Sequence, residues 1–328
     1  MLFGIGKRRL LCPYCLAELR TRGEPDICPS CKTELPVQYV HDYEQHPPFF
    51  TQVFGWSRAG KTVFQYAMTL MLMKMANVWP KYTFAPATNA TLLKTQEINS
   101  YLQNGVMPPM TQMGDQEVYV MLLRNMERWG GRTLVLRDCA GEIFDTMEVP
   151  VKQAPYLLNA PTTFMFLSLP DLPNSKGRSI DHLLNNYINT LMKHKINFAK
   201  EQRKLVVVFT KADLIPELPA NLRNYLINDP LWAAVNTRGT VNQLDTLTMQ
   251  SYIETMMRVS DTIRDWVDAD FAGKTFIRLA EQKNIDLRFS LISSTGAAVG
   301  EDGAMVESLA PRRVLDPFFW ALELQSKA

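Results

Sequence analysis

Short apolar runs along the chain alternate with segments whose apolar residues recur at helical spacing. Residues 49–54 form an apolar run typical of a strand, and the segment at 63–71 has apolar residues every three or four positions. Residues 204–209 are almost continuously apolar, as in a strand that is buried on both faces. Residues 285–292 alternate between apolar and polar positions, which also predicts a strand. The chain is therefore expected to fold as an α/β protein.

Further helices are predicted from end signals and from amphipathic spacing. Residues 89–104 are expected to form a helix that ends at Gly105, and Asp316-Pro317 has the residues that favour a helix start. Two apolar stripes at helical spacing predict other helices: Leu183, Leu184, Tyr187, Ile188 and Leu191 in one, and Tyr252, Met256, Val259, Ile263 and Trp266 in the other.

Two regions between these elements have a distinct character. An antiparallel hairpin is predicted from residues 118–124, a turn at Trp129-Gly130-Gly131 and the strand that leads into Asp138. Residues 214–284 are long for a single connection between two strands. We expect a helical insertion there, which would offer a surface to a partner.

The composition is that of a globular protein. The chain has 328 residues, which allows two domains, and 46% of them are hydrophobic and 21% charged. The net charge of +2 argues against a protein whose main role is to coat nucleic acid. The most apolar long stretch, residues 63–79, is short for a bilayer and contains Lys74, so no membrane span is predicted. The sequence begins without the pattern of a secretory signal, and we expect a cytoplasmic location.

Cysteines cluster near the beginning of the sequence. Four of the five lie within the first 31 residues, as two Cys-x2-Cys pairs: Cys12 with Cys15, and Cys28 with Cys31. Each pair can offer two thiolates to one ion, so together they predict a tetrahedral structural Zn²⁺ site. A segment of about 30 residues cannot bury enough apolar surface to fold by itself, and the metal would supply the missing stability.

We therefore expect a zinc ribbon at residues 1–36, followed by a polar, proline-marked linker at residues 37–48. The sequence does not distinguish protein from nucleic acid as the partner of this ribbon. A redox role for the first Cys-x2-Cys pair is the alternative, but no βαβ pattern surrounds that pair.

A glycine-rich segment follows the first predicted strand and precedes a helix. It reads Gly55-Trp56-Ser57-Arg58-Ala59-Gly60-Lys61-Thr62 and matches the phosphate-loop pattern G-x-x-x-x-G-K-[ST]. The glycines let backbone N–H groups curl around a phosphate, and the helix that continues through Val63 adds the positive end of its dipole. In this pattern Lys61 contacts the β- and γ-phosphates, and Thr62 offers its hydroxyl to Mg²⁺. Residues 55–63 are therefore expected to bind the phosphates of a nucleotide.

A second signal, D-x-x-G, stands at the end of the hairpin strand. Asp138 is expected to hold Mg²⁺ through water, and the N–H of Gly141 to meet the γ-phosphate. A threonine ahead of the hairpin is in the place of a γ-phosphate sensor and Mg²⁺ ligand, and Thr111 is the candidate. Thr91 and Thr95 are rivals, but both fall within a predicted helix.

A third signal, Thr210-Lys211-Ala212-Asp213, follows the apolar run 204–209. The Asp213 carboxylate would accept hydrogen bonds from the N1–H and the 2-amino group of guanine. Adenine has neither donor there, so its binding would leave a desolvated carboxylate unpaired, at a cost of about 1–3 kcal/mol. The Lys211 stem would lie across the base. The segment therefore predicts a guanine nucleotide.

A weaker fourth signal is the turn Ser293-Ser294-Thr295-Gly296, which follows the last predicted strand. Backbone N–H groups of Ser294 and Thr295 could reach the guanine O6. A Ser/Gly turn is common, so the prediction for this turn depends on its position in the chain after the other three signals.

These signals, in this order, resemble the GTP-binding domain of the TRAFAC-class, Ras-like GTPases over about residues 49–320. Together with the four cysteines and the segment Arg312-Arg313-Val314-Leu315-Asp316-Pro317-Phe318-Phe319-Trp320, the chain resembles the bacterial double-GTPase family. The resemblance implies a three-layer domain at residues 49–328, in which a mixed six-stranded, mostly parallel sheet has helices on both faces. It also implies Mg²⁺, a second GTPase or a second copy as partner, and a role in conflict with phage.

Two residues depart from the Ras-like pattern. Glu142 stands where Ras-like enzymes have the glutamine that orients water, and its carboxylate would be repelled by the γ-phosphate. Slow intrinsic hydrolysis is therefore expected. Arg58 stands where large GTPases of the guanylate-binding and atlastin type have an internal arginine finger, so Arg58 is a candidate catalytic residue beside Lys61, Thr111 and Glu142.

Two functions remain open on the sequence. The first is a GTP-hydrolysing molecular switch that presents its state to a partner. The second is a slow or inactive GTPase that serves as a nucleotide-bound adaptor, whose ribbon binds protein or nucleic acid.

Overall fold

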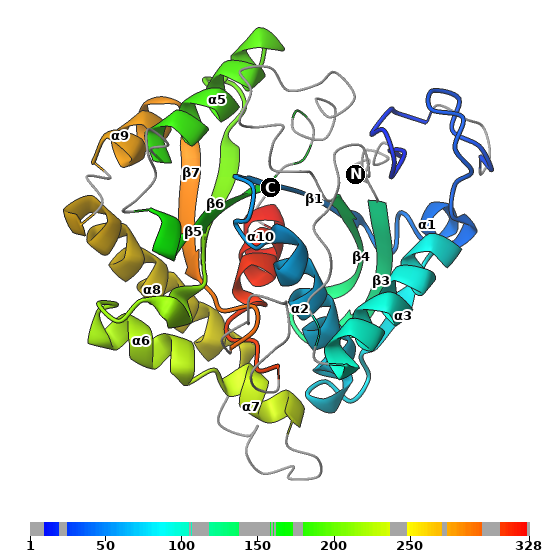
Figure 1. Ribbon diagram of the computed structural model, residues 1–328. Helices are drawn as coiled ribbons and strands as arrows, with labels where there is room; N and C mark the ends of the chain where they lie inside the picture. Colours follow the sequence, from blue (N-terminus) through cyan, green and yellow to red (C-terminus); the bar gives the residue numbers. More distant parts are fainter. Residues whose placement is uncertain are drawn as a thin grey trace, which may run out of the picture.

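A twisted sheet forms the centre of the structure, with helices packed on both of its faces (Figure 1). The computed structural model describes residues 10–19, 25–104, 106, 118–137, 158, 160, 162–172, 180–236, 248–270, 274–296 and 309–326. Within these residues seven strands pair in the order β2-β3-β4-β1-β5-β6-β7. The strands are β1 (Pro48–Gly55), β2 (Thr83–Pro86), β3 (Val118–Met126), β4 (Gly130–Arg137), β5 (Thr162–Ser168), β6 (Arg203–Thr210) and β7 (Ile285–Leu291).

Five of these strands are parallel. β4, β1, β5, β6 and β7 pair in parallel, and β3 runs against both of its neighbours. The carboxyl ends of β1, β4, β5, β6 and β7 therefore meet at one edge of the sheet, which is where open α/β sheets bind their ligands. β1, β5 and β6 are almost entirely buried, as expected for central strands covered on both faces.

The helices alternate with the strands along most of the chain. They are α1 (Val37–His41), α2 (Lys61–Lys74), α3 (Asn89–Gln103), α5 (Ile180–Lys193), α6 (Ala220–Ile227), α7 (Pro230–Asn236), α8 (Met249–Asp270), α9 (Lys274–Gln282) and α10 (Asp316–Ser326), with short 3-10 turns η1 (Met75–Asn77), η3 (Leu169–Asp171) and η4 (Ala212–Leu214). Among the described helices, none has both the length and the apolar composition to cross a bilayer.

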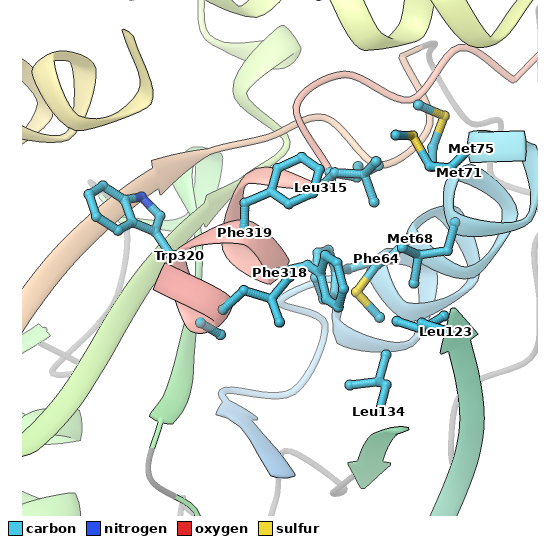
Figure 2. Packing of buried hydrophobic residues seen from close by; sticks show 14 of the residues in the cluster. Phe64, Met68, Met71, Met75, Leu123, Leu134, Leu315, Phe318, Phe319 and Trp320 are labelled. Carbon is cyan, nitrogen blue, oxygen red and sulfur yellow. The ribbon is translucent and has the colours of Figure 1, made fainter. Parts of the chain in front are cut away.

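One face of the sheet is covered by α2 and α10, which lie together over its middle (Figure 1). Their aromatic and methionine side chains interdigitate above β3 and β4, as Figure 2 shows for Phe64, Met68, Phe318 and Phe319. Each such side chain, when fully buried, stabilises the fold by about 1.5–3 kcal/mol. The carboxyl-terminal helix is therefore a central part of this core.

The opposite face is covered by two separate groups of residues. α5 and α9 pack over β5, β6 and β7, and the predicted stripe on α5 is buried throughout. At the other end of the same face, the cysteine-containing segment and α1 pack on Phe50 of β1, Val120 of β3 and Val135 of β4. In the described part of residues 214–284 the chain is mostly helical, as expected, in α6, α7, α8 and α9.

The structure differs from the sequence predictions in the sheet. The α/β class with a mostly parallel sheet is confirmed, but the sheet has seven described strands and the resemblance implied six. The additional strand is β2, which is short, half-exposed and paired with β3 at the edge of the sheet. The central strand β5 was not predicted. Its residues follow the apolar run expected of a buried strand, so the signal was present.

Candidate functional site

The phosphate loop begins where β1 makes its closest approach to β5. Gly55 pairs with Phe166 and has a φ of +152°, and a Cβ on this residue would lie 2.4 Å from the carbonyl oxygen of Phe166. Glycine is therefore required here for both space and backbone conformation. The strand can then deliver the loop directly to the edge of the sheet.

The loop turns through two residues with left-handed backbone conformation. Arg58 has a φ of +65° and Gly60 a φ of +80°. The N–H of Ala59 donates to the carbonyl of Trp56 at 3.3 Å, and the N–H of Phe64 donates to the carbonyl of Gly60 at 2.9 Å, which starts α2. This succession of left-handed residues before a helix turns backbone N–H groups toward a common centre, an arrangement that binds anions.

Lys61 lies across the opening of this loop. Its Nζ donates to the carbonyl oxygens of Gly55 at 3.1 Å and Trp56 at 2.9 Å, and its side chain is buried. The ammonium is therefore placed within the loop, where it can serve as a positive charge for a phosphate. Thr62 and Val63 follow in the first turn of α2 and are half-buried.

The hydroxyl of Thr210 connects the phosphate loop to the third sequence signal. Thr210 Oγ1 donates to the carbonyl of Ala59 at 2.9 Å, from the end of β6. Thr210 is buried, and Gly60 packs against it, since a Cβ on Gly60 would lie 3.7 Å from Thr210 Oγ1. Thr210 therefore connects the phosphate loop to the end of β6, and its predicted contact with a nucleotide stays a prediction.

After Thr210, Lys211 is partly exposed and Asp213 is exposed, whereas Ala212 between them is buried. Lys211 has a φ of +56°, and its Nζ lies 3.7 Å from Oδ2 of Asp171 in η3. Asp213 lies in η4 and is exposed. The N–H of Ala212 donates to the carbonyl of Ile292 at 3.2 Å, which joins this loop to the end of β7. Asp171 was not predicted, because β5, the strand that precedes it, was not predicted.

The fourth signal forms a tight turn beyond β7. The N–H of Gly296 donates to Oγ of Ser293 at 2.9 Å, and Ser293 pairs with Arg312 in an isolated bridge. Ser294 is buried and Thr295 is half-buried. The structure thus brings the first, third and fourth signals to one edge of the sheet, although they are separated by up to about 240 residues of chain.

The second signal lies outside the described residues. β4 ends at Arg137, which pairs with Gln52 of β1, so the strand that precedes Asp138 runs to the same edge. The residues Thr111, Asp138, Gly141 and Glu142 are themselves outside the part of the chain that the structure describes. The rival threonines are buried in α3: Thr91 Oγ1 accepts from the N–H of Val120, and Thr95 Oγ1 donates to the carbonyl of Thr91.

The four cysteine sulfurs form one compact cluster. All four Sγ atoms lie within 4.8 Å of one another, with Cys12 and Cys31 at 3.8 Å and Cys15 and Cys28 at 3.7 Å. Four sulfurs around a tetrahedral zinc ion with bonds of about 2.3 Å would be about 3.8 Å apart. Burial raises the pKa of the Cys12 and Cys15 thiols, so their thiolates are costly unless a cation lies beside them. The donor set therefore fits a structural zinc ion.

The two cysteine turns have the same backbone design. The N–H of Leu16 donates to the carbonyl of Cys12, and the N–H of Lys32 donates to that of Cys28, each at 2.9 Å. Leu16 and Lys32 both have positive φ, of 58° and 61°. An antiparallel bridge encloses each turn, Leu11 with Glu18 around the first and Ile27 with Glu34 around the second. This repeat of one turn is the architecture of a zinc ribbon.

Helix α1 joins this ribbon to the sheet. Tyr39 Oη donates to the carbonyl of Leu11 at 2.5 Å, and the N–H of Leu11 donates to Tyr43 Oη at 3.1 Å. Asp42 forms an ion pair with Arg124 of β3 at 2.8 Å. The segment expected as a linker thus contains a helix, and Tyr39 in this helix and Tyr43 just after it are buried against the cysteine-containing segment.

A phosphate loop after β1, a T-K-x-D segment after β6 and a serine- and threonine-containing turn after β7, on the edge of a mostly parallel sheet, define a Ras-like P-loop GTPase, a class of GTP-binding switch proteins. The model of the Double-GTPase 2 family matches residues 51–267, about two thirds of the chain. The chain belongs to this family, and it has a zinc-ribbon-like cysteine cluster at its beginning.

Solved structures with GTPase descriptions are similar to this chain. The GTPase-like domain of S. cerevisiae Ski7, bound to GDP and inorganic phosphate, is 14% identical, with a TM-score of 0.35 over 88% of this chain and 53% of that chain. This chain thus spans about half the length of the Ski7 chain that it matches. The signal recognition particle receptor SRb-GTP/SRX complex from Chaetomium thermophilum is 13% identical, with a TM-score of 0.33 over 76% of this chain and 94% of that chain. No protein in the curated set matches this chain.

Proposed function

We propose that this protein is a GTP-hydrolysing molecular switch that presents its nucleotide state to a partner protein. The observation that carries the proposal is the hydrogen bond from Thr210 Oγ1 to the carbonyl of Ala59, because it places the T-K-x-D segment directly beside the phosphate loop. One nucleotide can then contact both segments, its phosphates at residues 55–63 and its base at Lys211 and Asp213. The turn at Ser294 and Thr295 completes the base site.

The selection of guanine by Asp213 provides the first test. We expect Asp213→Ala to weaken GDP binding by about 10-fold or more, since a hydrogen bond to a charged group contributes about 1.5–3 kcal/mol. Isothermal titration calorimetry with GDP and ADP measures the effect. Asp261→Ala, which removes an exposed aspartate on α8, is the matched control. Undiminished GDP affinity in Asp213→Ala would contradict the proposal.

Magnesium belongs to the proposed site. Thr62, in the first turn of α2, is in the described part of the chain, and Asp138 and Thr111 are proposed to complete the set. A bound Mg²⁺ would neutralise part of the charge on the β- and γ-phosphates. We propose that Thr111 and the segment after Gly141 distinguish GTP from GDP through the γ-phosphate.

Hydrolysis is proposed to involve Arg58 together with Lys61, Thr111 and Glu142. The Arg58 side chain is exposed and belongs to the loop that would surround the phosphates. A guanidinium there could neutralise the charge that develops on the transferred phosphoryl group. Glu142, next to the D-x-x-G glycine, would repel the γ-phosphate, so we expect slow hydrolysis without a partner.

This proposal predicts that Arg58→Ala lowers the single-turnover rate of phosphate release by about tenfold or more while GDP affinity is unchanged. Arg58→Lys is the matched variant. It keeps a side chain at the backbone φ of +65° and a positive charge, but it loses the planar guanidinium group. Release of phosphate from pre-bound GTP measures both. An unchanged rate in Arg58→Ala, also after a partner is added, would contradict the role of Arg58.

The second candidate function is a nucleotide-bound adaptor with little or no turnover, and Glu142 is the observation that favours it. Tight, Mg²⁺-dependent GTP binding without single-turnover release would support the adaptor over the switch. In either case we propose a second GTPase or a second copy of this chain as partner. We propose the cytoplasm as its location, and a bacterial system in conflict with phage as its setting.

A further inference from the structure

The turn Ser293–Gly296, which is proposed to donate to the guanine O6, is hydrogen-bonded through its backbone to residues 310–312. Ser293 and Arg312 exchange two backbone hydrogen bonds, of 3.1 and 2.8 Å, and the N–H of Ala310 donates to the carbonyl of Thr295 at 2.7 Å. Gly296 is so close to this segment that a Cβ on it would lie 1.8 Å from the carbonyl oxygen of Ala310. The position of the turn is therefore set by the position of residues 310–312.

The residue that follows this hydrogen-bonded segment, residues 310–312, is a buried arginine. Arg313 has a φ of +57° and its side chain is 5% exposed. Its backbone N–H donates to Oδ2 of Asp229 at 2.6 Å, and its guanidinium donates to the carbonyl oxygens of Tyr225 at 2.8 Å and Asn228 at 2.6 Å. The same guanidinium lies 3.7 Å from the centre of the Tyr225 ring. A planar fork stacked on an aromatic ring is a geometry that lysine cannot reproduce.

The groups around Arg313 are anchored in turn. Oδ1 of Asp229 accepts from the N–H groups of Leu231 and Trp232, at 3.0 and 3.2 Å, at the start of α7. Asp316, in the first turn of α10, accepts from the hydroxyls of Tyr225 and Tyr252. Because α6, α7, α8 and α10 all meet at this cluster, Arg313 occupies a fixed position in the molecule.

We infer that Arg313 is a positioning residue for guanine recognition. It sets the distance between the backbone N–H groups of the Ser294-Thr295 turn and the guanine O6. The inference rests on the proposed function, in which this turn donates a backbone N–H to O6. Arg313 itself does not contact the nucleotide. It acts through Arg312, the neighbouring residue whose backbone is paired with Ser293.

The proposal is tested by the discrimination between oxygen and sulfur at position 6 of the base. Dissociation constants of GDP, 6-thio-GDP, IDP and ADP are measured by competition with a fluorescent GDP analogue. Sulfur is a weak acceptor, so the wild-type protein is expected to prefer GDP over 6-thio-GDP by about 3- to 10-fold. In Arg313→Lys this preference falls below about twofold, because the turn no longer meets O6. The preference for GDP over IDP, which lacks the 2-amino group read by Asp213, stays at its wild-type value.

Two further variants separate positioning from loss of stability. Arg128→Lys weakens a different arginine contact to α10, the ion pair of Arg128 with Glu323, and should leave both preferences unchanged. Asp229→Asn removes the charge that accepts from the N–H of Arg313 and should act like Arg313→Lys, so it replaces that variant if Arg313→Lys does not fold.

Equal weakening of GDP and 6-thio-GDP in Arg313→Lys, or unchanged GDP affinity, would overturn the positioning role. A wild-type protein that prefers GDP to ADP but not to 6-thio-GDP would overturn it as well, and would leave Asp213 as the guanine-reading residue. A wild-type protein without preference for GDP over ADP would overturn the proposed function itself.

Discussion

At Gly55 the chain must satisfy two conditions that only glycine meets together. The residue ends β1 at a positive φ of 152° and lies against the backbone of Phe166 in β5. At Gly130, the first residue of β4, the φ of +65° also favours glycine, but a Cβ would meet nothing within 4 Å. The two positions therefore separate the effect of crowding from that of backbone conformation.

We predict that Gly55→Ala lowers the free energy of unfolding by about 3 kcal/mol or more, because overpacking and backbone strain add together. Gly130→Ala, the matched control, should lose only about 1–2 kcal/mol. Urea unfolding followed by circular dichroism measures both. Equal losses at the two positions would show that β5 moves aside at little cost.

Glycine and cysteine were the residues whose roles the sequence predicted best. A phosphate loop needs glycine for reasons that act within one or two residues, and two Cys-x2-Cys turns of one design were expected to bind one ion. Arg313 and Asp171 were not predicted as functional, because their roles depend on partners that are distant in the sequence. Thr210 was predicted, but its buried hydroxyl contacts the carbonyl of Ala59 and so connects two loops.

At the level of elements, the zinc-ribbon-like segment, residues 10–19 and 25–36, packs on the sheet as part of the folded domain. Its cysteine turns and α1 cover Phe50, Val120 and Val135 on the outer face of β1, β3 and β4. β1 leads into the phosphate loop and β4 leads to Asp138, so the ribbon supports the strands that carry two of the four nucleotide signals. A ribbon on a free tether would have no such effect.

We predict that loss of the metal destabilises the whole domain. Cys12→Ser should remove bound zinc and lower the temperature of the main unfolding transition by about 5 °C or more, as expected for a loss of a few kcal/mol in a domain of this size. Zinc content by plasma mass spectrometry and unfolding by scanning calorimetry measure the two effects. Ser30→Ala, an exposed residue of the second cysteine turn, is the control.

The opposite result is also informative about the architecture. If Cys12→Ser lost its zinc while the main transition and GDP affinity were unchanged, the ribbon would be an independent adaptor. That outcome would favour the second candidate function.

At the scale of the whole molecule, the carboxyl-terminal helix joins the sheet to the helices of the 214–284 region. Phe318 and Phe319 of α10 pack with α2 over the sheet (Figure 2), and Asp316 accepts hydrogen bonds from Tyr225 of α6 and Tyr252 of α8. Burial raises the pKa of Asp316 from 3.8 to about 6, although Arg313 and the two tyrosine hydroxyls act in the opposite direction. Asp229 is the other carboxylate near this group.

This shift predicts a pH dependence of stability. The folded state retains the proton of Asp316 more tightly than the unfolded chain does, so its stabilising contribution is complete below about pH 4 and is lost as the pH rises through about 6. Relative to Asp316→Asn, the wild-type protein should therefore lose about 2.4 kcal/mol of unfolding free energy between pH 4 and pH 7. Urea unfolding at the two pH values measures this difference.

Asp261→Asn is the control for this prediction, because it removes an exposed carboxylate on α8 and should show a smaller change. A difference between wild type and Asp316→Asn that was the same at both pH values would mean that folding does not raise the pKa of Asp316.

The sequence by itself determined the α/β class, the hairpin, the glycine-rich loop between β1 and α2, the position of the T-K-x-D segment after a strand, and the cysteine cluster. Each of these depends on backbone conformations or ligand atoms that lie within a few consecutive residues, so the pattern is visible without knowledge of distant contacts. The tertiary structure alone decided that β2 extends the sheet, that the cysteine-containing segment covers β1, β3 and β4, and that the residue next to Arg313 pairs with Ser293 at the turn beyond β7. These features depend on side chains separated by tens to hundreds of residues, and only the packing of the sheet and its helices brings such side chains together.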